Sequence, residues 1–420
     1  MKKLIPFLLS VIVLIAISSC EKELVKNDSG EADLKSASSP DLTPEELLGK
    51  NLFFDHISEP GSMDCADCHG PNVGFTGPNP GINIKGAVYR GATPQRFGNR
   101  KPPSAAYATF SPVFYYDDEE GLFIGGNFWD GRATGEHLGN PAADQALGPF
   151  LNPVEQNNPS KKAVLENIAG SQYADLWEKV WGEPLDVTDE ANIEKNYDRV
   201  GLAIAAYEAS SEVNQFSSKY DYYLMGMVEL TEQEAWGLEL FEGKAMCSAC
   251  HPSEWDGVND LPLFTDFSFD NLGVPRNPDN PFYDMDKVYL DDGSPVNPLG
   301  DEWVDPGLGG FLETRPEWQA VAAENMGKHK VPTLRNVGKA PGNNFPKAFT
   351  HNGVFKSLKE VVHFYNTRDV EGAGWNGVPW AEPEVAENVN TEELGNLGLT
   401  DEEEDAIVAF MHTLSDGYKK

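Results

Sequence analysis

The sequence CADCH at residues 65–69 occurs again in the same pattern, as CSACH at residues 247–251. Two thiols three residues apart can each bond to one vinyl group of a haem, and the histidine that follows can reach the iron from one side. Zinc-binding knuckles also use Cys-x-x-Cys, but paired knuckles usually lie about 15–20 residues apart. The two motifs of this chain begin at residues 65 and 247, far beyond that separation. We therefore expect two covalently bound c-type haems. The predicted haem-binding residues are Cys65, Cys68, His69, Cys247, Cys250 and His251.

The start of the chain predicts export. Lys2 and Lys3 precede an apolar run that is too short to span a bilayer as a mature helix. The Ile-Ser-Ser-Cys that follows resembles a bacterial lipoprotein signal, in which Cys20 becomes the lipidated first residue; an ordinary cleaved signal with an incidental cysteine is the alternative. We expect a signal peptide over residues 1–19 and a flexible tether over residues 20–42. The protein would then lie in the periplasm or cell envelope, anchored to the membrane through Cys20.

The charge of the chain limits its partners. The full sequence has a net charge of −35, and loss of the leader with its two lysines makes this −37. Such a chain repels phosphates, so nucleic acid is excluded as a partner. A basic redox protein is one partner that the charge would attract, and simple solubility of an exported protein is an equal explanation.

An internal repeat divides the rest of the chain. The spacing Thr-x-x-Glu-x-x-Gly-x-x-Leu-Phe runs from Thr43 towards the first motif and from Thr231 towards the second. Each copy begins as a capping box and predicts a helix ahead of its haem. We expect a mostly α fold of two cytochrome c-like haem domains, an N-terminal one over residues 43–228 and a C-terminal one over residues 229–420.

Apolar periodicity predicts further helices at residues 192–212, 358–365 and 401–414. Long stretches rich in Gly and Pro occupy residues 70–103 and 262–310. Such composition favours turns over strands, so we expect irregular loops around the cofactors there.

Five further segments carry a family resemblance. They are Phe128–Ala133, Gln145–Pro149, Asn152–Glu155, Val331–Asn336 and His351–Gly353. With the two haem motifs, they make the chain similar to the bacterial dihaem cytochrome c peroxidase and MauG family over nearly all of the mature sequence. The resemblance implies that the N-terminal haem reacts with peroxide and that the C-terminal haem stores or relays electrons.

The same resemblance implies roles for three side chains near the first haem. Glu155 would carry a proton between the two oxygens of peroxide, since cleavage of the O–O bond requires one to move. Gln145 would be its hydrogen-bonding neighbour, and Trp129 would relay electrons between the haems. Without the resemblance, Glu155 is one of 67 acidic residues and would be assigned to the surface.

The first haem is expected to be open on its reactive face. Many peroxidases of the family place a second histidine in the loop after the first motif, but no histidine lies between His69 and His137. Lys85, Tyr89 and Arg96 in that region offer no comparable neutral nitrogen ligand. We predict a first haem that needs no reductive activation, and we place His137 in a surface loop.

The second haem needs another axial ligand opposite His251. Leu358, Val361, Val362 and Tyr365 share one face of the helix predicted there. Tyr365 stands where family peroxidases carry a Met ligand and where MauG-like members carry Tyr, so we predict that Tyr365 binds this iron. A phenolate would favour higher oxidation states of the iron. The alternative is a buried core tyrosine with Met326 or another residue as ligand.

The resemblance also implies a calcium ion, which family members often hold between the domains with an Asn side chain and backbone carbonyls. Here Lys101 takes that position, and a cation beside a lysine is disfavoured, so calcium is uncertain.

Three functions follow from these features. The first is a peroxidase that reduces hydrogen peroxide to water with electrons from a small cytochrome or cupredoxin. The second is a MauG-like enzyme that uses peroxide to oxidise Trp or Tyr residues of a partner protein. The third is a non-enzymatic electron carrier, which would need two six-coordinate haems and would leave Gln145 and Glu155 without a role.

Overall fold

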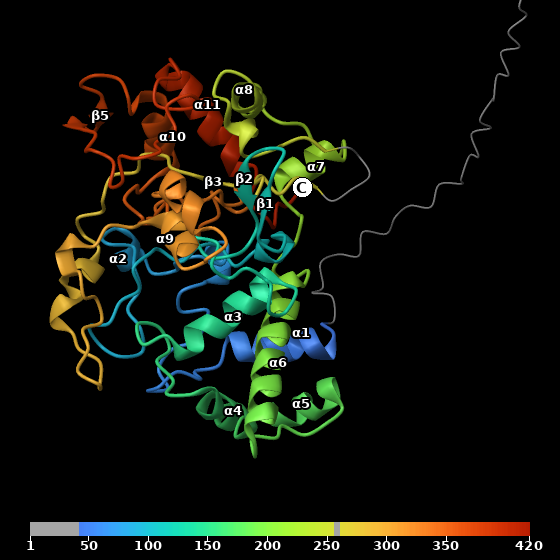
Figure 1. The fold of residues 1–420 in the computed structure, drawn as a ribbon. Helices are drawn as coiled ribbons and strands as arrows, with labels where there is room; N and C mark the ends of the chain where they lie inside the picture. The colour runs from blue at the N-terminus through green and yellow to red at the C-terminus, as the bar shows by residue number, and fades with distance from the viewer. Residues whose placement is uncertain (1–41, 256–260) are drawn as a thin grey trace, which may run out of the picture. The chain divides into compact units, whose positions relative to one another are not determined.

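Helices dominate the part of the chain that the structure, a computed structural model, describes: residues 42–255 and 261–420 (Figure 1). These residues belong to one compact unit. The predicted signal peptide, Cys20 and almost all of the predicted tether lie outside the described residues. None of the described helices is both long enough and apolar enough to cross a membrane.

The α-helices are α1 Pro44–Phe53, α2 Pro80–Asn83, α3 Pro141–Leu151, α4 Lys161–Ala169, α5 Ala174–Trp181, α6 Glu190–Ala209, α7 Lys219–Leu224, α8 Glu232–Glu242, α9 Gly307–Glu313, α10 Leu358–Thr367 and α11 Asp401–His412. Short 3₁₀ helices are η1 Pro71–Val73, η2 Ala108–Phe110, η3 Cys247–Ala249, η4 Pro281–Lys287, η5 Gly300–Glu302 and η6 Gln319–Asn325. The strands form three antiparallel pairs: β1 Tyr115–Asp117 with β2 Leu122–Ile124, β3 Phe269–Asp270 with β4 His329–Lys330, and β5 Gly374–Trp375 with β6 Val378–Pro379. The expectation of a mostly α fold is thus confirmed for secondary structure.

The two predicted capping boxes are present. The hydroxyl of Thr43 accepts a hydrogen bond from the backbone N–H of Glu46 at 3.2 Å, and the Glu46 carboxylate accepts one from the Thr43 N–H at 2.6 Å. Thr231 and Glu234 repeat this arrangement at 3.3 and 2.7 Å. Each box satisfies N–H groups that a helix start leaves unpaired, so α1 and α8 begin where the sequence predicts.

The repeat also determines how these helices pack. A Cβ atom on Gly49 of α1 would lie 1.8 Å from the carbonyl oxygen of Ala203 in α6. A Cβ atom on Gly237 of α8 would lie 1.9 Å from that of Ala406 in α11. Glycine at the same place in each copy therefore lets two helix backbones touch, α1 on α6 and α8 on α11. Figure 1 shows these pairs in separate parts of the described fold.

The three helices predicted from periodicity are confirmed within a few residues, as α6, α10 and α11. The stretch 70–103 contains only η1 and α2, and 262–310 contains only short elements. Helices α3, α4, α5, α7 and α9 were not predicted. Several are short, and α3 carries Pro149 in its last turn, which masks the helical signal.

Buried apolar side chains form separate clusters. The largest gathers around α1 and α6, with Phe53, Phe150 and Trp177 almost fully buried. Another gathers around α8 and α11, and the Tyr220 ring of α7 packs 5.2 Å from that of Phe410 in it. The division into haem domains at residue 228 stays a prediction.

Candidate haem-binding and peroxide site

The first Cys-x-x-Cys-His motif forms a tight turn after α1. The backbone N–H of His69 donates to the carbonyl oxygen of Cys65 at 2.8 Å, which brings both thiols and the imidazole to one cavity. His69 Nδ1 lies 3.2 Å from the carbonyl oxygen of Phe75. A proton held there leaves Nε2 unprotonated and free to bind a metal. Burial lowers the pKa of His69 to about 4, which favours the neutral ring that a metal requires.

The second motif repeats this arrangement with another loop. His251 Nδ1 lies 2.7 Å from the carbonyl oxygen of Phe264, and the His251 N–H donates to the carbonyl oxygen of Cys247 at 2.9 Å. Burial lowers the pKa of His251 as well. The supporting carbonyl lies thirteen residues after His251 but six after His69, so this part of the repeat is structural and is not visible in the sequence.

The two cavities fit two large cofactors. Both are open to solvent, with about 1670 and 1570 Å³ of space when the solvent at their mouths is counted. Cys65 and Cys68 line the first cavity and Cys247 and Cys250 the second, and all four thiols are free of disulfides. Each cavity thus presents a pair of thiols and the imidazole of its own motif, which is the donor set for a c-type haem; His329 and His351 also line the second cavity.

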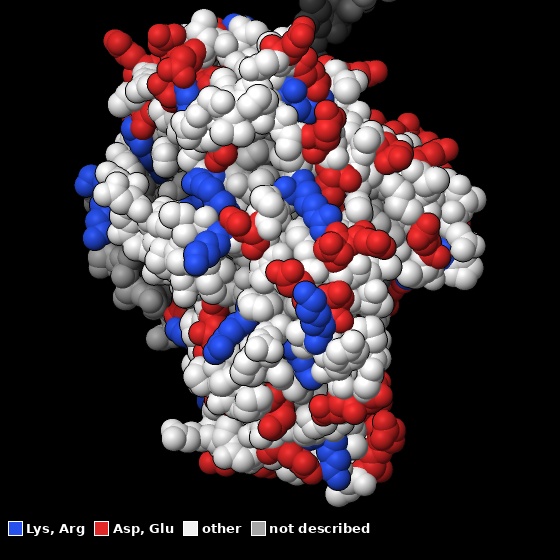
Figure 2. Space-filling view, turned by 90° about the vertical axis from the view of Figure 1, so that its left-hand side faces the viewer, with Lys and Arg blue, Asp and Glu red and all other residues white. Residues whose placement is uncertain are grey.

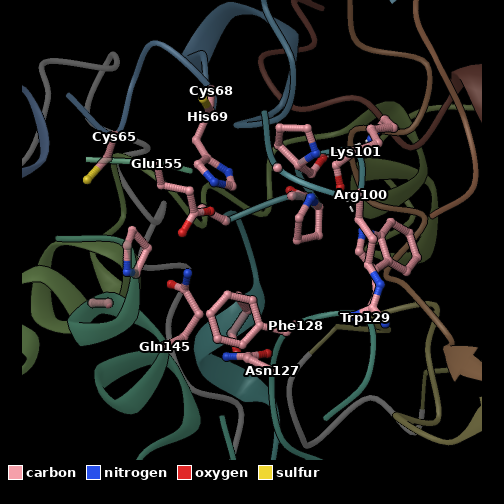
Figure 3. A pocket seen from close by; sticks show the side chains of 18 of the residues that line it. Cys65, Cys68, His69, Arg100, Lys101, Asn127, Phe128, Trp129, Gln145 and Glu155 are labelled. Atoms are coloured by element: carbon pink, nitrogen blue, oxygen red, sulfur yellow. Dashed lines mark hydrogen bonds between the residues drawn. The ribbon is translucent and has the colours of Figure 1, made fainter. Parts of the chain in front are cut away.

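Glu155 lines the first cavity, as does Gln145 (Figure 3). Asn152 Nδ2 donates to the Glu155 carboxylate at 2.8 Å. The backbone carbonyl of Glu155 accepts a hydrogen bond from the N–H of Ala92 at 2.7 Å, so both the side chain and the backbone of Glu155 are held in place. Burial raises the pKa of Glu155 above its usual range, with the positive charge of Arg132 opposing the shift. A carboxyl group that holds a proton more tightly than usual is suited to passing it on.

Two further carboxyl groups line this cavity, and sequence reasoning missed both. They are Asp64, beside the haem motif, and Glu208 on α6. Glu208 is 4% exposed, and burial raises its pKa to about 8. Its signal in the sequence was an acidic residue that follows the mainly apolar run 200–207 of α6, which alone does not indicate a cavity. Asn152 was part of a recognised segment, but its bond to Glu155 emerges only from the fold.

The described lining of the first cavity contains one histidine, His69, and no second imidazole. Tyr89 also lines it, but its hydroxyl accepts from the N–H of Asn79 at 2.7 Å and is thereby engaged. His137 lies at the surface with its ring 2.7 Å from Asp198, as expected.

Tyr365 lines the second cavity together with Leu358 and Val361 of the same helix face. Its hydroxyl forms no hydrogen bond with any residue that the structure describes. Burial, with the nearby Cys250 and Asp270, raises the pKa of Tyr365. Met326 does not line this cavity; its sulfur lies against Gly309 of α9. Tyr365 is therefore available as a ligand where Met326 is not.

Trp129 stands in a wall that both cavities share. It is 8% exposed, and its indole N–H donates to the carbonyl oxygen of Lys101 at 2.8 Å. Lys101, Trp129 and Lys330 line both cavities. Next to this wall, Asp305, His329 and His351 bring ligand atoms within 4.8 Å of one another. Both carboxylate oxygens of Asp305 already accept from Arg100, at 2.6 and 2.7 Å, so the group is not an oxygen cage of the kind that calcium prefers.

A fold with two such cavities, each with its own Cys-x-x-Cys-His motif, defines a dihaem c-type cytochrome. Residues 44–229 match the family model for dihaem cytochrome c peroxidases. The chain is 35% identical to the methylamine utilization protein MauG of Paracoccus denitrificans, over 88% of each protein. It is 26% identical to the cytochrome-c peroxidase IdrP2 of Denitromonas iodatirespirans, over 88% of this chain and 80% of the relative. The chain therefore belongs to the dihaem cytochrome c peroxidase and MauG family.

A solved structure of the family agrees. The dihaem peroxidase BthA from Burkholderia thailandensis is 30% identical in sequence and superposes with a TM-score of 0.71, over 91% of this chain and 88% of that one. A MauG-like protein associated with microbial copper homeostasis shares the fold at a TM-score of 0.58, with 23% identity over 90% of this chain and 91% of that one.

Proposed function

We propose that this protein is a dihaem peroxidase that reduces hydrogen peroxide to water. Two electrons come from a small redox protein, enter at the C-terminal haem and pass to the N-terminal haem, and two protons complete the formation of two water molecules. The observation that carries the proposal is the first cavity. It combines one imidazole, a buried carboxyl group held by an amide, and no second histidine among its described lining residues.

The haems, when bound, would supply two iron centres that exchange electrons. His69 and His251 would hold them through Nε2, each fixed by a backbone carbonyl on Nδ1. Glu155 would move a proton from one oxygen of peroxide to the other as the O–O bond breaks, so that the second oxygen leaves as water. The two electrons and two further protons would reduce the remaining oxygen to the other water molecule. Asn152 would keep the carboxyl group aimed into the cavity, and Gln145, which lines the same cavity, would be a second hydrogen-bonding neighbour of Glu155.

Electrons would cross through Trp129. Its indole borders both cavities, and its N–H is tied to Lys101, so the ring is fixed in the wall. A fixed aromatic ring between two redox centres shortens the distance that an electron crosses in each transfer step. The hydrogen bond from the indole N–H keeps the ring in one orientation.

A MauG-like oxidation of Trp or Tyr residues on a partner protein is the second candidate. Tyr365 favours it, because an oxygen ligand at the second haem stabilises high oxidation states better than a thioether would. The 35% identity with the P. denitrificans MauG adds support. A simple electron carrier is disfavoured, because it would leave the carboxyl and amide of the first cavity unused.

The chain would be exported, with its haems attached outside the cytoplasm, and anchored to a membrane through lipid on Cys20. This part of the proposal rests on the leader sequence.

Stopped-flow absorbance on the fully ferric protein tests the resting state. One equivalent of peroxide should change both haem spectra within the first second, before any reductant is added. A long-lived change at both haems, followed by turnover of a partner protein but not of a small donor, would favour the MauG-like reaction. No reaction until one electron is supplied would mean that a ligand closes the first haem.

Replacing Glu155 with Gln tests the proton carrier. We expect peroxide turnover to fall about 100-fold or more, since a positioned acid–base group contributes about 10²–10⁴-fold, while both haems stay attached. The matched control is Glu208→Gln, which removes the other deeply buried acid of the same cavity and should change turnover far less. If the Glu208 variant is inactive and the Glu155 variant is not, the proton carrier is assigned to the wrong residue.

A further inference from the structure

Two lysines lie in the wall between the cavities without an acidic partner. Lys101 is 8% exposed, and its ammonium donates to the hydroxyl of Thr76 at 2.9 Å and the carbonyl oxygen of Pro102 at 3.0 Å. Lys330 donates to the hydroxyl of Ser111 at 2.5 Å and to the carbonyl oxygen of Gly126. Every one of these acceptors is uncharged.

An ammonium group has three donors. Two are used on each lysine, and the described residues offer no acceptor for the third. Neither lysine has a carboxylate within ion-pair distance among the described residues. The charge of Asp266 raises the pKa of Lys330 against the larger effect of burial, but the Asp266 carboxylate accepts a hydrogen bond from the Ser268 hydroxyl. Removing a cation from water without a counter-charge costs several kcal/mol. Burial accordingly lowers the pKa of both lysines to about 7.

The buried arginines beside the cavities are paired with acids, whereas Lys347, which lines the second cavity, uses its three donors on the backbone carbonyls of Val73, Asn336 and Lys339. Arg100 donates to Asp305 at 2.6 Å and to Asp130 at 2.5 Å. Arg335 donates to Asp221 at 2.8 Å. The described residues thus supply acids for the buried arginines beside the cavities but none for the two lysines that border both cavities (Figure 3 shows Lys101 beside Arg100 and Trp129). An anionic group of the bound cofactors would supply the negative charge that these two lysines lack.

Each haem carries two propionate carboxylates, so two haems bring four negative charges. We propose that Lys101 and Lys330 form a paired cation site that binds propionates of both haems and raises the reduction potentials of both. The lysines then supply within the chain the positive charge that a bound metal ion would otherwise provide. The inference rests on the presence of two haems and does not depend on which reaction they catalyse.

The test uses Lys101→Met and Lys330→Met in the haem-loaded protein, with the midpoint potentials measured by optical redox titration. Loss of a nearby positive charge favours ferric over ferrous iron, so both potentials should fall. We expect about a tenfold change in the equilibrium constant for reduction, or about 59 mV for a one-electron couple. Lys101→Arg should leave both potentials close to those of the unsubstituted protein, because arginine keeps the positive charge.

The matched control is Lys356→Met. Lys356 is also a partly buried lysine, and it donates only to backbone carbonyls, those of Asn83, Lys85 and Gly353, but it lines neither cavity. Its removal should leave both potentials unchanged. Haem content, measured by mass spectrometry, shows that each variant is loaded.

Two results would overturn the proposal. One is unchanged potentials in both cavity variants with two haems attached. The other is an equal shift in the Lys356 variant, which would make the effect one of general charge or stability. Should Lys330→Met fail to fold, Lys330→Gln keeps two polar contacts while removing the charge and gives the same readout.

Discussion

A histidine that binds iron needs one ring nitrogen held and the other free. His69 and His251 both meet this condition through backbone carbonyls, those of Phe75 and Phe264. The sequence predicts the two histidines from their place after Cys-x-x-Cys. It does not predict the carbonyls, because these come from loops whose lengths differ and whose course depends on packing.

At the same scale, Tyr365 tests the assignment of the second haem. Its hydroxyl lines the cavity and has no partner among the described residues. Replacing Tyr365 with Phe should remove the oxygen ligand and change the low-spin haem spectrum, while the high-spin spectrum of the first haem stays as it was. Electron paramagnetic resonance of the ferric protein separates the two signals. An unchanged low-spin signal would rule out Tyr365 as a ligand.

At the scale of helices, the tertiary structure shows which helices pack against each other. The sequence repeat predicts α1 and α8 with their capping boxes, and the structure adds that the repeated glycine is a contact point. Gly49 meets Ala203 in α6, and Gly237 meets Ala406 in α11. Sequence spacing identifies the glycine but not the helix that it touches, because the contacted residues Ala203 and Ala406 lie 154 and 169 residues further on.

Gly49→Ala and Gly237→Ala should each destabilise the protein. A methyl group less than 2 Å from a backbone oxygen must push two helices apart, and overpacking of this kind costs about 1–3 kcal/mol or more. Urea unfolding followed by circular dichroism measures the loss. Gly170→Ala is the control, since Gly170 has helical backbone angles and a Cβ atom there meets nothing closer than 3.6 Å. Equal stability of all three variants would contradict the packing argument.

Two cavities with one shared wall are the result at the scale of the molecule. Residues far apart in the sequence, such as Lys101, Trp129 and Lys330, border both of them. The chain is acidic overall, with a net charge of −35, and the face in Figure 2 carries groups of Asp and Glu side chains with Lys and Arg between them. This charge suits a basic electron donor.

The dependence of electron transfer on salt tests that expectation. With a basic c-type cytochrome as donor, the second-order rate constant should fall about tenfold or more between low salt and 0.5 M salt, since electrostatic steering contributes about 10–10³-fold and is screened within ~10 Å at 0.1 M. An acidic donor of similar size is the control and should show the opposite trend. A rate constant that does not depend on salt with either donor would leave solubility as the reason for the charge.

The sequence by itself determined the cofactor-binding motifs, the starts of α1 and α8 and the family, because each depends on residues a few positions apart. Covalent haem attachment needs a fixed local spacing, and a capping box spans one helical turn. Only the tertiary structure decided that Glu155 is held by Asn152, that Glu208 lines the same cavity and that two lysines in the shared wall lack an acid. Burial and pairing depend on distant segments, and these physical conditions determine which of many charged residues belong to a site.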